Sequence, residues 1–183
     1  KPLILRGARQ VGKSTLVHVF CQKSGRRLFE VNLEQEYKLR RCFESLKPEQ
    51  ILKEIEYHYG TTIDSKKDLL FFDEIQTTPQ AIVSLRYFYE QMPELPVLAA
   101  GSLLDFALTH EKISVPVGRI EYGFVRPFSF EEFLMAKEEK KLLNLLMTYE
   151  VGSPFPEVAH EKLSQILREY FYVGGMPEAI QVY

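Results

Sequence analysis

Apolar and polar positions follow two different spacings along the first two thirds of the chain. Five apolar runs have the length of strands, at residues 3–5, 27–33, 69–72, 97–100 and 120–125. The run at 69–72, Leu-Leu-Phe-Phe, has no polar position, as expected of a strand buried on both faces of a sheet. Because helical stretches separate these runs, the pattern predicts an α/β fold with a mostly parallel, five-stranded sheet.

Amphipathic stretches between the runs have the spacing of helices. Helices are predicted at residues 13–24, 48–59 and 79–92, each followed by a glycine or a proline that ends it. The first helix should bury Leu16, Val17 and Phe20 on one face, and Thr78 should cap the third. The polar segment 34–47 is also expected to be mostly helical.

The character of the chain changes after Pro127, beyond which no strand is predicted. Ser129 and Glu132 form a capping-box pattern that predicts the start of a long helix. We therefore expect two domains, an α/β core at 1–127 and a small helical lid at 128–183. Both ends look cut, because the first strand begins almost at once and the last helix has only started. The chain is interpreted as a fragment of a longer protein.

A phosphate-binding motif lies between the first predicted strand and the first predicted helix. Residues 7–14 fit Gly-x-x-x-x-Gly-Lys-Ser/Thr, the P-loop pattern, at every fixed position. Glycines let the backbone turn its N–H groups toward phosphate oxygens, and the helix start adds a positive dipole end. Lys13 should reach the β- and γ-phosphates, and the Ser14 hydroxyl should coordinate Mg²⁺. The predicted nucleotide-contacting residues are Gly7, Ala8, Arg9, Gln10, Val11, Gly12, Lys13, Ser14 and Thr15.

An acidic pair, Asp73-Glu74, directly follows the most apolar strand. Ligands of parallel α/β sheets bind at the carboxyl ends of the strands, so the pair should face the phosphate site. Asp73 suits the Mg²⁺ shell, and Glu74 suits the polarisation of an attacking water as a general base. The alternative for the pair is solvated charge at a strand end. For the loop, the alternative is a glycine turn with a solvent-facing lysine.

Composition narrows the range of functions. The 183 residues carry a net charge of −2, with 45% hydrophobic and 26% charged residues, which is ordinary for a soluble globular protein. Basic residues cluster only in pairs, so general nucleic-acid binding is not supported. Two cysteines without CxxC spacing favour a reduced, cytoplasmic protein. The most apolar stretch, 97–108, is shorter than a membrane-spanning helix requires.

Taken together, the motifs resemble the AAA-type P-loop ATPases of bacteria and archaea that carry a C-terminal domain of unknown function. The matching stretches are Gly-Ala-Arg-Gln-Val-Gly-Lys-Ser at 7–14, Phe-Phe-Asp-Glu-Ile-Gln at 71–76, Ala-Gly-Ser at 100–102, Gly-Arg at 118–119, Pro-Phe-Ser-Phe-Glu-Glu-Phe at 127–133 and Gly-Gly-Met-Pro-Glu at 174–178. The family's usual first segment and its C-terminal domain are missing. The resemblance implies ATP and Mg²⁺ as cofactors, and self-association or a protein partner through the missing domain.

The resemblance also implies roles for three further residues. Ser102 resembles the polar sensor of the γ-phosphate or the attacking water; its alternative is a helix cap. Arg119 resembles a sensor or finger for the γ-phosphate, in its own chain or a neighbour's; its alternative is a surface arginine. Pro177 resembles a proline that packs on the adenine base; its alternative is a simple turn.

Three functions share these motifs. The first is an ATPase in which Glu74 activates water. The second is a nucleotide-gated switch with little turnover, in which the lid moves with the γ-phosphate. The third is a small-molecule kinase, which the acidic pair and the strand ending in Ser102 disfavour. A GTPase is not supported, because the chain has no Asn-Lys-x-Asp sequence.

Overall fold

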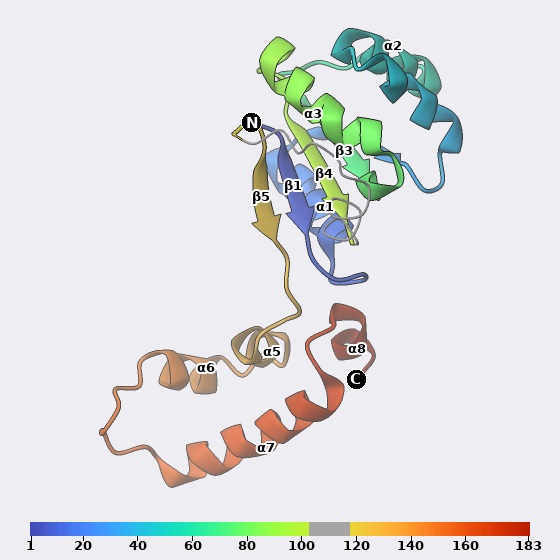
Figure 1. The fold of residues 1–183 in the computed structure, drawn as a ribbon. Coiled ribbons are helices and arrows are strands. Elements are labelled where there is room, and N and C mark those ends of the chain that lie inside the picture. The colour runs from blue at the N-terminus through green and yellow to red at the C-terminus, as the bar shows by residue number, and fades with distance from the viewer. Residues whose placement is uncertain (103–117) are drawn as a thin grey trace. The chain divides into compact units, whose positions relative to one another are not determined.

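The computed structural model describes residues 1–102 and 118–183. Its five strands are all parallel and form one sheet in the order β2-β3-β4-β1-β5 (Figure 1). The strands are β1 Leu3–Arg6, β2 Arg27–Asn32, β3 Asp68–Asp73, β4 Val97–Gly101 and β5 Glu121–Phe124. The predicted α/β fold with a five-stranded parallel sheet is confirmed.

Helices cover both faces of this sheet. Helix α1 (Lys13–Ser24) packs on one face, and the 3₁₀ helix η1 (Tyr37–Ser45), α2 (Pro48–Tyr59) and α3 (Pro79–Gln91) pack on the other. Alternation along β3 separates the two cores: Leu70 and Phe72 face α2 and α3, whereas Leu69 and Phe71 face α1. Every residue of β3 is buried, as its uninterrupted apolar run predicts.

Two expectations for this part of the chain were wrong in detail. Helix α1 buries Lys13, Val17 and Cys21, spaced four apart, while Leu16 and Phe20 stay 49% exposed. Those two lie one position, about 100°, around the helix from the buried stripe. Thr78 stands at the N-cap of α3, but its hydroxyl makes no capping hydrogen bond.

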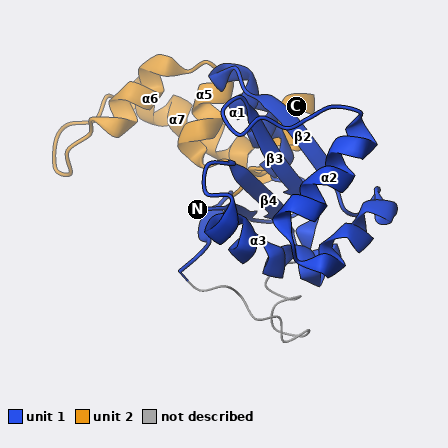
Figure 2. Ribbon diagram, turned by 90° about the horizontal axis from the view of Figure 1, so that it is seen from above, with its two compact units in different colours: residues 1–125 blue, residues 126–183 orange. Residues whose placement is uncertain are grey.

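The chain divides into two compact units, Lys1–Val125 and Arg126–Tyr183, coloured separately in Figure 2. The second unit holds α5 (Phe130–Ala136), α6 (Lys140–Met147), α7 (Glu157–Val173) and α8 (Pro177–Val182). Its core gathers apolar side chains from three of them: Phe133, Leu134, Leu142, Leu163 and Ile166.

The helix predicted to begin at Ser129 does begin there, with both hydrogen bonds of the capping box formed. It is short, however, because Glu138 adopts a left-handed conformation at φ 58° and the chain turns into α6. The turn lets Phe133 and Leu142 reach the same small core, which one straight helix would not allow.

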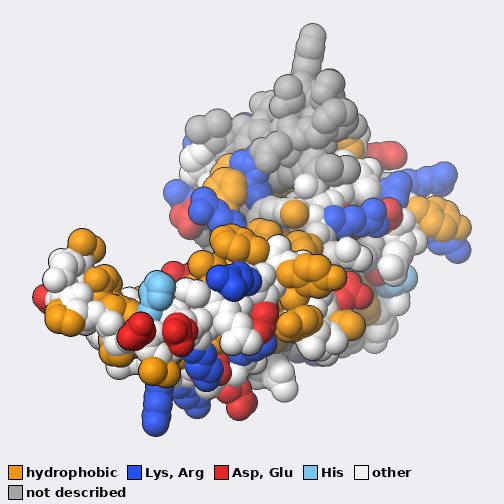
Figure 3. Space-filling view, turned by 90° about the horizontal axis from the view of Figure 1, so that it is seen from below, with side chains coloured by type: hydrophobic (Ala, Val, Ile, Leu, Met, Phe, Trp, Pro, Cys, Tyr) orange, Lys and Arg blue, Asp and Glu red, His pale blue; other side chains and the backbone are white. Residues whose placement is uncertain are grey.

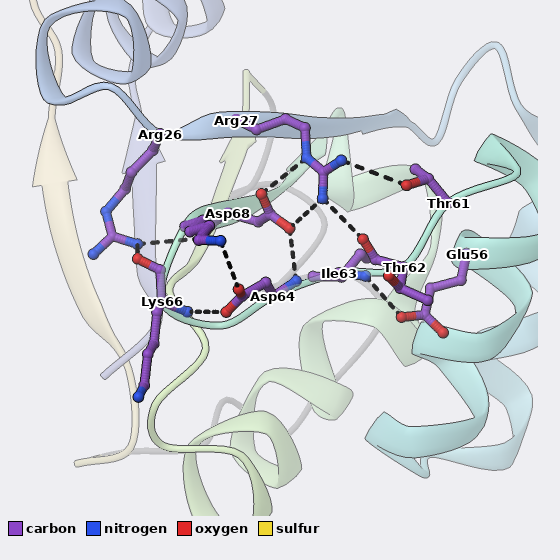
Figure 4. Close-up of polar contacts among 10 residues, drawn as sticks. Arg26, Arg27, Glu56, Thr61, Thr62, Ile63, Asp64, Lys66 and Asp68 are labelled. Carbon is purple, nitrogen blue, oxygen red and sulfur yellow. Dashed lines mark hydrogen bonds and ion pairs between the residues drawn. The ribbon is translucent and has the colours of Figure 1, made fainter.

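A polar network joins the beginnings of β2 and β3, at the edge of the sheet away from the P-loop (Figure 4). Asp68 is 1% exposed and accepts two hydrogen bonds from Arg27, 2.9 Å to Oδ1 and 2.7 Å to Oδ2. The Asp64 amide adds a third at 2.6 Å. The hydrogen bonds from Arg27 are the largest cause that lowers the pKa of Asp68. Through these bonds the buried carboxylate joins the first residue of β2 to the first residue of β3.

On the face shown in Figure 3, basic and acidic side chains of the described residues are interspersed, so neither positive nor negative charge dominates it. Both cysteines are free. Within the part of the chain that the structure describes, none of the helices combines the length and the apolar character needed to cross a membrane.

Candidate functional site

The P-loop connects the carboxyl end of β1 to the first turn of α1. It turns through residues with positive φ, at Gly7 (151°), Gln10 (62°) and Gly12 (94°). Gly7 passes so close to β5 that an added Cβ would lie 2.1 Å from the carbonyl oxygen of Val125. Only glycine fits this approach, which sets where the loop begins.

The start of α1 is open for an anion. Its N-cap residue is Gly12, which has no side chain to cap the first turn, so the first N–H groups of the helix are left for the oxygens of a ligand. Of the predicted contact residues, Val11 and Lys13 are buried, and Gly7, Gly12 and Ser14 are half-buried. Ala8, Arg9, Gln10 and Thr15 are exposed.

Lys13 lies inside the loop that it helps to form. Its Nζ donates hydrogen bonds to the carbonyl oxygens of Gly7 (3.0 Å) and Ala8 (2.7 Å), and the residue is 7% exposed. Burial lowers the pKa of the Lys13 amine, while the charges of Glu74 and Asp73 raise it. Both acids, some 60 positions beyond Lys13 in the sequence, therefore act on its ammonium group.

Ser14 and Asp73 join the two motifs directly. The Ser14 hydroxyl donates a hydrogen bond of 2.7 Å to Oδ2 of Asp73. The other oxygen, Oδ1, accepts the backbone N–H of Glu74 at 2.9 Å, so both oxygens of this buried carboxylate are fixed. The arrangement places a hydroxyl and a carboxylate side by side next to Lys13.

Glu74 begins the short 3₁₀ helix η2 (Ile75–Thr77) in a left-handed conformation, at φ 50°. Its carboxylate oxygen Oε2 accepts a hydrogen bond of 2.6 Å from Nε2 of Gln76. Sequence reasoning did not assign a role to Gln76. The signal was its place in the Phe-Phe-Asp-Glu-Ile-Gln stretch, two residues beyond the expected general base.

Ser102 is the last described residue before the gap, and it directly follows β4. Strand β4 lies between β1 and β3 in the sheet. The half-buried Ser102 is therefore at the carboxyl edge, on the strand between those that lead into the P-loop and the acidic pair. Residues 103–117 lie outside the described part of the chain.

Arg119 is at the opposite end of the strands, the amino end. It precedes β5, whose first residue Glu121 is in register with Leu3 at the start of β1. Its Nε donates a hydrogen bond of 3.3 Å to Glu90, near the end of α3. At ~3.3 Å per residue, Arg119 lies roughly 20 Å along the strands from Gly7. The structure does not bring Arg119 to the P-loop of its own chain.

Pro177 belongs to the second unit, where it opens α8. The glycines before it have a structural task there. A Cβ at Gly175 would lie 2.3 Å from the carbonyl oxygen of Phe128, and the Phe128 amide donates a 2.7 Å hydrogen bond to the Gly175 carbonyl. The segment is thus held against the entrance of α5 by backbone contact.

The donor set at the P-loop fits a magnesium ion held with a nucleotide. Among the residues that the structure describes, no three His, Cys, Asp or Glu side chains gather as a metal cage. Ser14 and Asp73 offer hard oxygen donors, which Mg²⁺ prefers. This ion commonly takes one or two protein oxygens and completes its shell with water and phosphate.

Comparison with known proteins found a family model and similar solved structures. A family model described as an AAA domain matches residues 1–134. The Walker-type ATPase PABY2304 of Pyrococcus abyssi is similar in structure, with a TM-score of 0.54 and 17% identity over 98% of this chain and 60% of that one. The FIGL-1 AAA domain has a TM-score of 0.55 and 15% identity over 99% of this chain and 57% of that one.

At these identities the two structures show a shared fold, and the present chain spans about three fifths of the length of each. Among curated proteins, no match to the sequence was found. The family model covers well over half of the chain, including the P-loop, the acidic pair and all five strands. The chain therefore belongs to the AAA domain family.

Proposed function

We propose that this protein binds ATP with Mg²⁺ at the loop from Gly7 to Ser14 and hydrolyses it to ADP and phosphate. The observation that carries the proposal is the 2.7 Å hydrogen bond between Ser14 and Asp73. It joins a phosphate-binding loop to the acid expected in the magnesium shell, beside the buried amine of Lys13. Membership in the AAA domain family supports the same function.

In this proposal the loop and α1 supply the binding energy. Backbone N–H groups of the loop and the open first turn of α1 hold the phosphate oxygens. Lys13, already desolvated and aimed into the loop, pairs with the β- and γ-phosphates. Ser14 and Asp73 would hold Mg²⁺, directly or through water, and the bound ion would supply positive charge beside the phosphate oxygens.

Glu74 is the general base of the proposed reaction. Its carboxylate takes a proton from water as the water oxygen attacks the γ-phosphorus, and the bond to the β–γ bridging oxygen breaks. Ser102 donates a hydrogen bond to the γ-phosphate or to that water. Its place at the end of β4, between β1 and β3, supports this role.

Arg119 extends the proposal beyond one nucleotide site. Because Arg119 lies at the far edge of its own sheet, we assign it to the γ-phosphate held by a second copy in a self-associated form. We place the protein in the narrower family with a C-terminal domain of unknown function, which would carry any protein partner. Two free thiols favour the cytoplasm.

Calorimetry with ATP and Mg²⁺, run together with phosphate release, tests the proposal. Lys13→Ala should weaken ATP binding by at least about tenfold, or ~1.4 kcal/mol. The exposed Lys23, in the last turn of the same helix, gives the matched control Lys23→Ala, which should bind as the wild type does. Equal ATP affinity in the two variants would refute the site.

Turnover separates the ATPase from the nucleotide-gated switch. Glu74→Gln should retain ATP binding and lose most of its phosphate release. If the wild-type chain binds ATP and its phosphate release does not exceed that of Glu74→Gln, the hydrolytic part is wrong and the switch remains.

A further inference from the structure

We propose that Gln76 is a positioning residue that aims the Glu74 carboxylate, an inference that rests on the hydrolytic function proposed above. Its Nε2 donates a 2.6 Å hydrogen bond to Oε2 of Glu74. The amide thereby fixes one carboxylate oxygen and leaves the other, Oε1, to accept a proton from water. A general base works only when its oxygen is held within hydrogen-bond reach of that proton.

The backbone around Glu74 is fixed, but its side chain needs a further restraint. Glu74 adopts the left-handed conformation, φ 50° and ψ 44°, and its carbonyl accepts hydrogen bonds from both the amide and the hydroxyl of Thr77. These contacts hold the main chain at the turn. The long side chain keeps several rotatable bonds, so the hydrogen bond from Gln76 is what selects one position for its carboxylate.

The amide of Gln76 takes its orientation from the carboxylate. Its Oε1 is buried and has no hydrogen-bond partner among the described residues, which costs free energy. Turning the amide over would bury Nε2 instead and set the carbonyl oxygen against the Glu74 carboxylate, with two acceptors facing each other. Among the described residues, the side chain therefore leaves one polar atom without a partner while it donates to Glu74. An apolar residue would fill the same place without that cost, which argues for a role beyond packing.

Gly101 leaves the space in which this amide lies. A Cβ at Gly101, the last residue of β4, would come within 2.5 Å of Oε1 of Gln76. The next nearest atoms, Cδ of Gln76 and Cγ2 of Ile75, would lie at the ordinary contact distance of 3.6 Å. Gly101 is not at positive φ, so alanine is compatible with its backbone. Gly101→Ala should therefore displace the tip of Gln76 and leave its surroundings nearly unchanged.

Two substitutions reach the same hydrogen bond from different sides. Gln76→Leu removes the donor and keeps a similar volume, and Gly101→Ala pushes the intact amide away. Each should lower kcat about ten- to a hundredfold, because a misplaced catalytic group costs rate rather than binding. ATP affinity measured by calorimetry should stay within about twofold. Gln80→Leu, at an exposed position of α3, is the matched control and should leave kcat unchanged.

Combining these substitutions with Glu74→Gln distinguishes a positioning role of Gln76 from a general structural defect. In a chain that already carries Glu74→Gln, Gln76→Leu and Gly101→Ala should not lower the residual rate further, because both act through the missing carboxylate. A structural defect would instead reduce the residual rate by the same factor as in the wild type, and that result would overturn the inference.

The outcomes also separate this inference from the function on which it rests. Wild-type turnover that survives in Gln76→Leu and Gly101→Ala would refute the positioning role alone. A wild-type chain that binds ATP without turnover would refute hydrolysis, and the positioning role with it.

Discussion

Replacing Gly7 by alanine should destabilise the protein through one identifiable contact. The new Cβ would lie 2.1 Å from the carbonyl oxygen and 3.1 Å from the carbonyl carbon of Val125. Neither atom belongs to a flexible side chain, and the Val125 amide is itself bonded to the Arg6 carbonyl at 2.8 Å. Either β5 must separate from β1 or the loop must leave its place.

The expected loss of stability in Gly7→Ala has two terms. Crowding a closely packed site costs ~1–3 kcal/mol. Holding a residue with a side chain at φ 151°, the conformation of Gly7, costs a further ~1–3 kcal/mol because only glycine adopts this region readily. Their sum, roughly 2–6 kcal/mol, corresponds to a fall in Tm of roughly 4–24 °C for a chain of this size.

Thermal unfolding of Gly7→Ala beside Gly25→Ala isolates the steric term. Gly25 also has a positive φ, 69°, but a Cβ there would meet nothing within 4 Å. Its variant should lose only the backbone term, a few degrees. Stabilisation by ATP and Mg²⁺ should persist in Gly25→Ala and disappear in Gly7→Ala. Equal Tm values for the two variants would show that the contact with Val125 does not limit the loop.

Three further expectations follow from other contacts. Asp68→Asn should lower the free energy of unfolding in urea by ~1–3 kcal/mol at neutral pH. The pKa of Asp68 is lowered in the folded chain, so its carboxylate stabilises the fold above the unfolded pKa of 3.8, and this stabilisation is lost as the pH falls through the folded pKa. The difference in the free energy of unfolding between wild type and Asp68→Asn should therefore shrink in acid. A pH-independent difference would contradict this. Gly175→Ala should destabilise the second unit by ~1–3 kcal/mol, because its Cβ would meet the Phe128 carbonyl. Amide hydrogen exchange in α5 and α8 should become faster, and unchanged exchange would rule out the clash. Ser129→Ala should cost ~1 kcal/mol through loss of the capping box, with unfolding in urea as the measurement and no change as the refuting result.

Much of the sheet and the loop could be predicted because the determining signals are local. The buried strand β3 follows from four consecutive apolar residues, and Gly25 and Gly60 end their helices in the left-handed conformation, as expected of glycine. The P-loop motif fixes its own backbone, so its position before α1 could be read without knowing the rest of the fold.

The remaining features depend on which segments meet in space. Arg119 lies at the end of the sheet away from the P-loop because it precedes β5, which runs parallel to β1. The order of strands that places β5 beside β1 is not contained in the spacing along the chain. The hydrogen bond from Gln76 to Glu74 depends on the left-handed turn at Glu74, which a non-glycine residue rarely adopts. The exposed face of α1 could not be predicted either, because Leu16 and Val17 are equally apolar.

The sheet order also has a consequence for how the protein is made. Strand β1, which leads into the P-loop, has no partner nearby in sequence: Leu3 pairs with Leu98 of β4 and with Glu121 of β5. A ribosome must therefore release nearly all of the first unit before β1 can be flanked on both sides. The proposed nucleotide site, although its loop precedes most of the sheet in sequence, is completed late, so its appearance during synthesis would report that β1 has been flanked by β4 and β5.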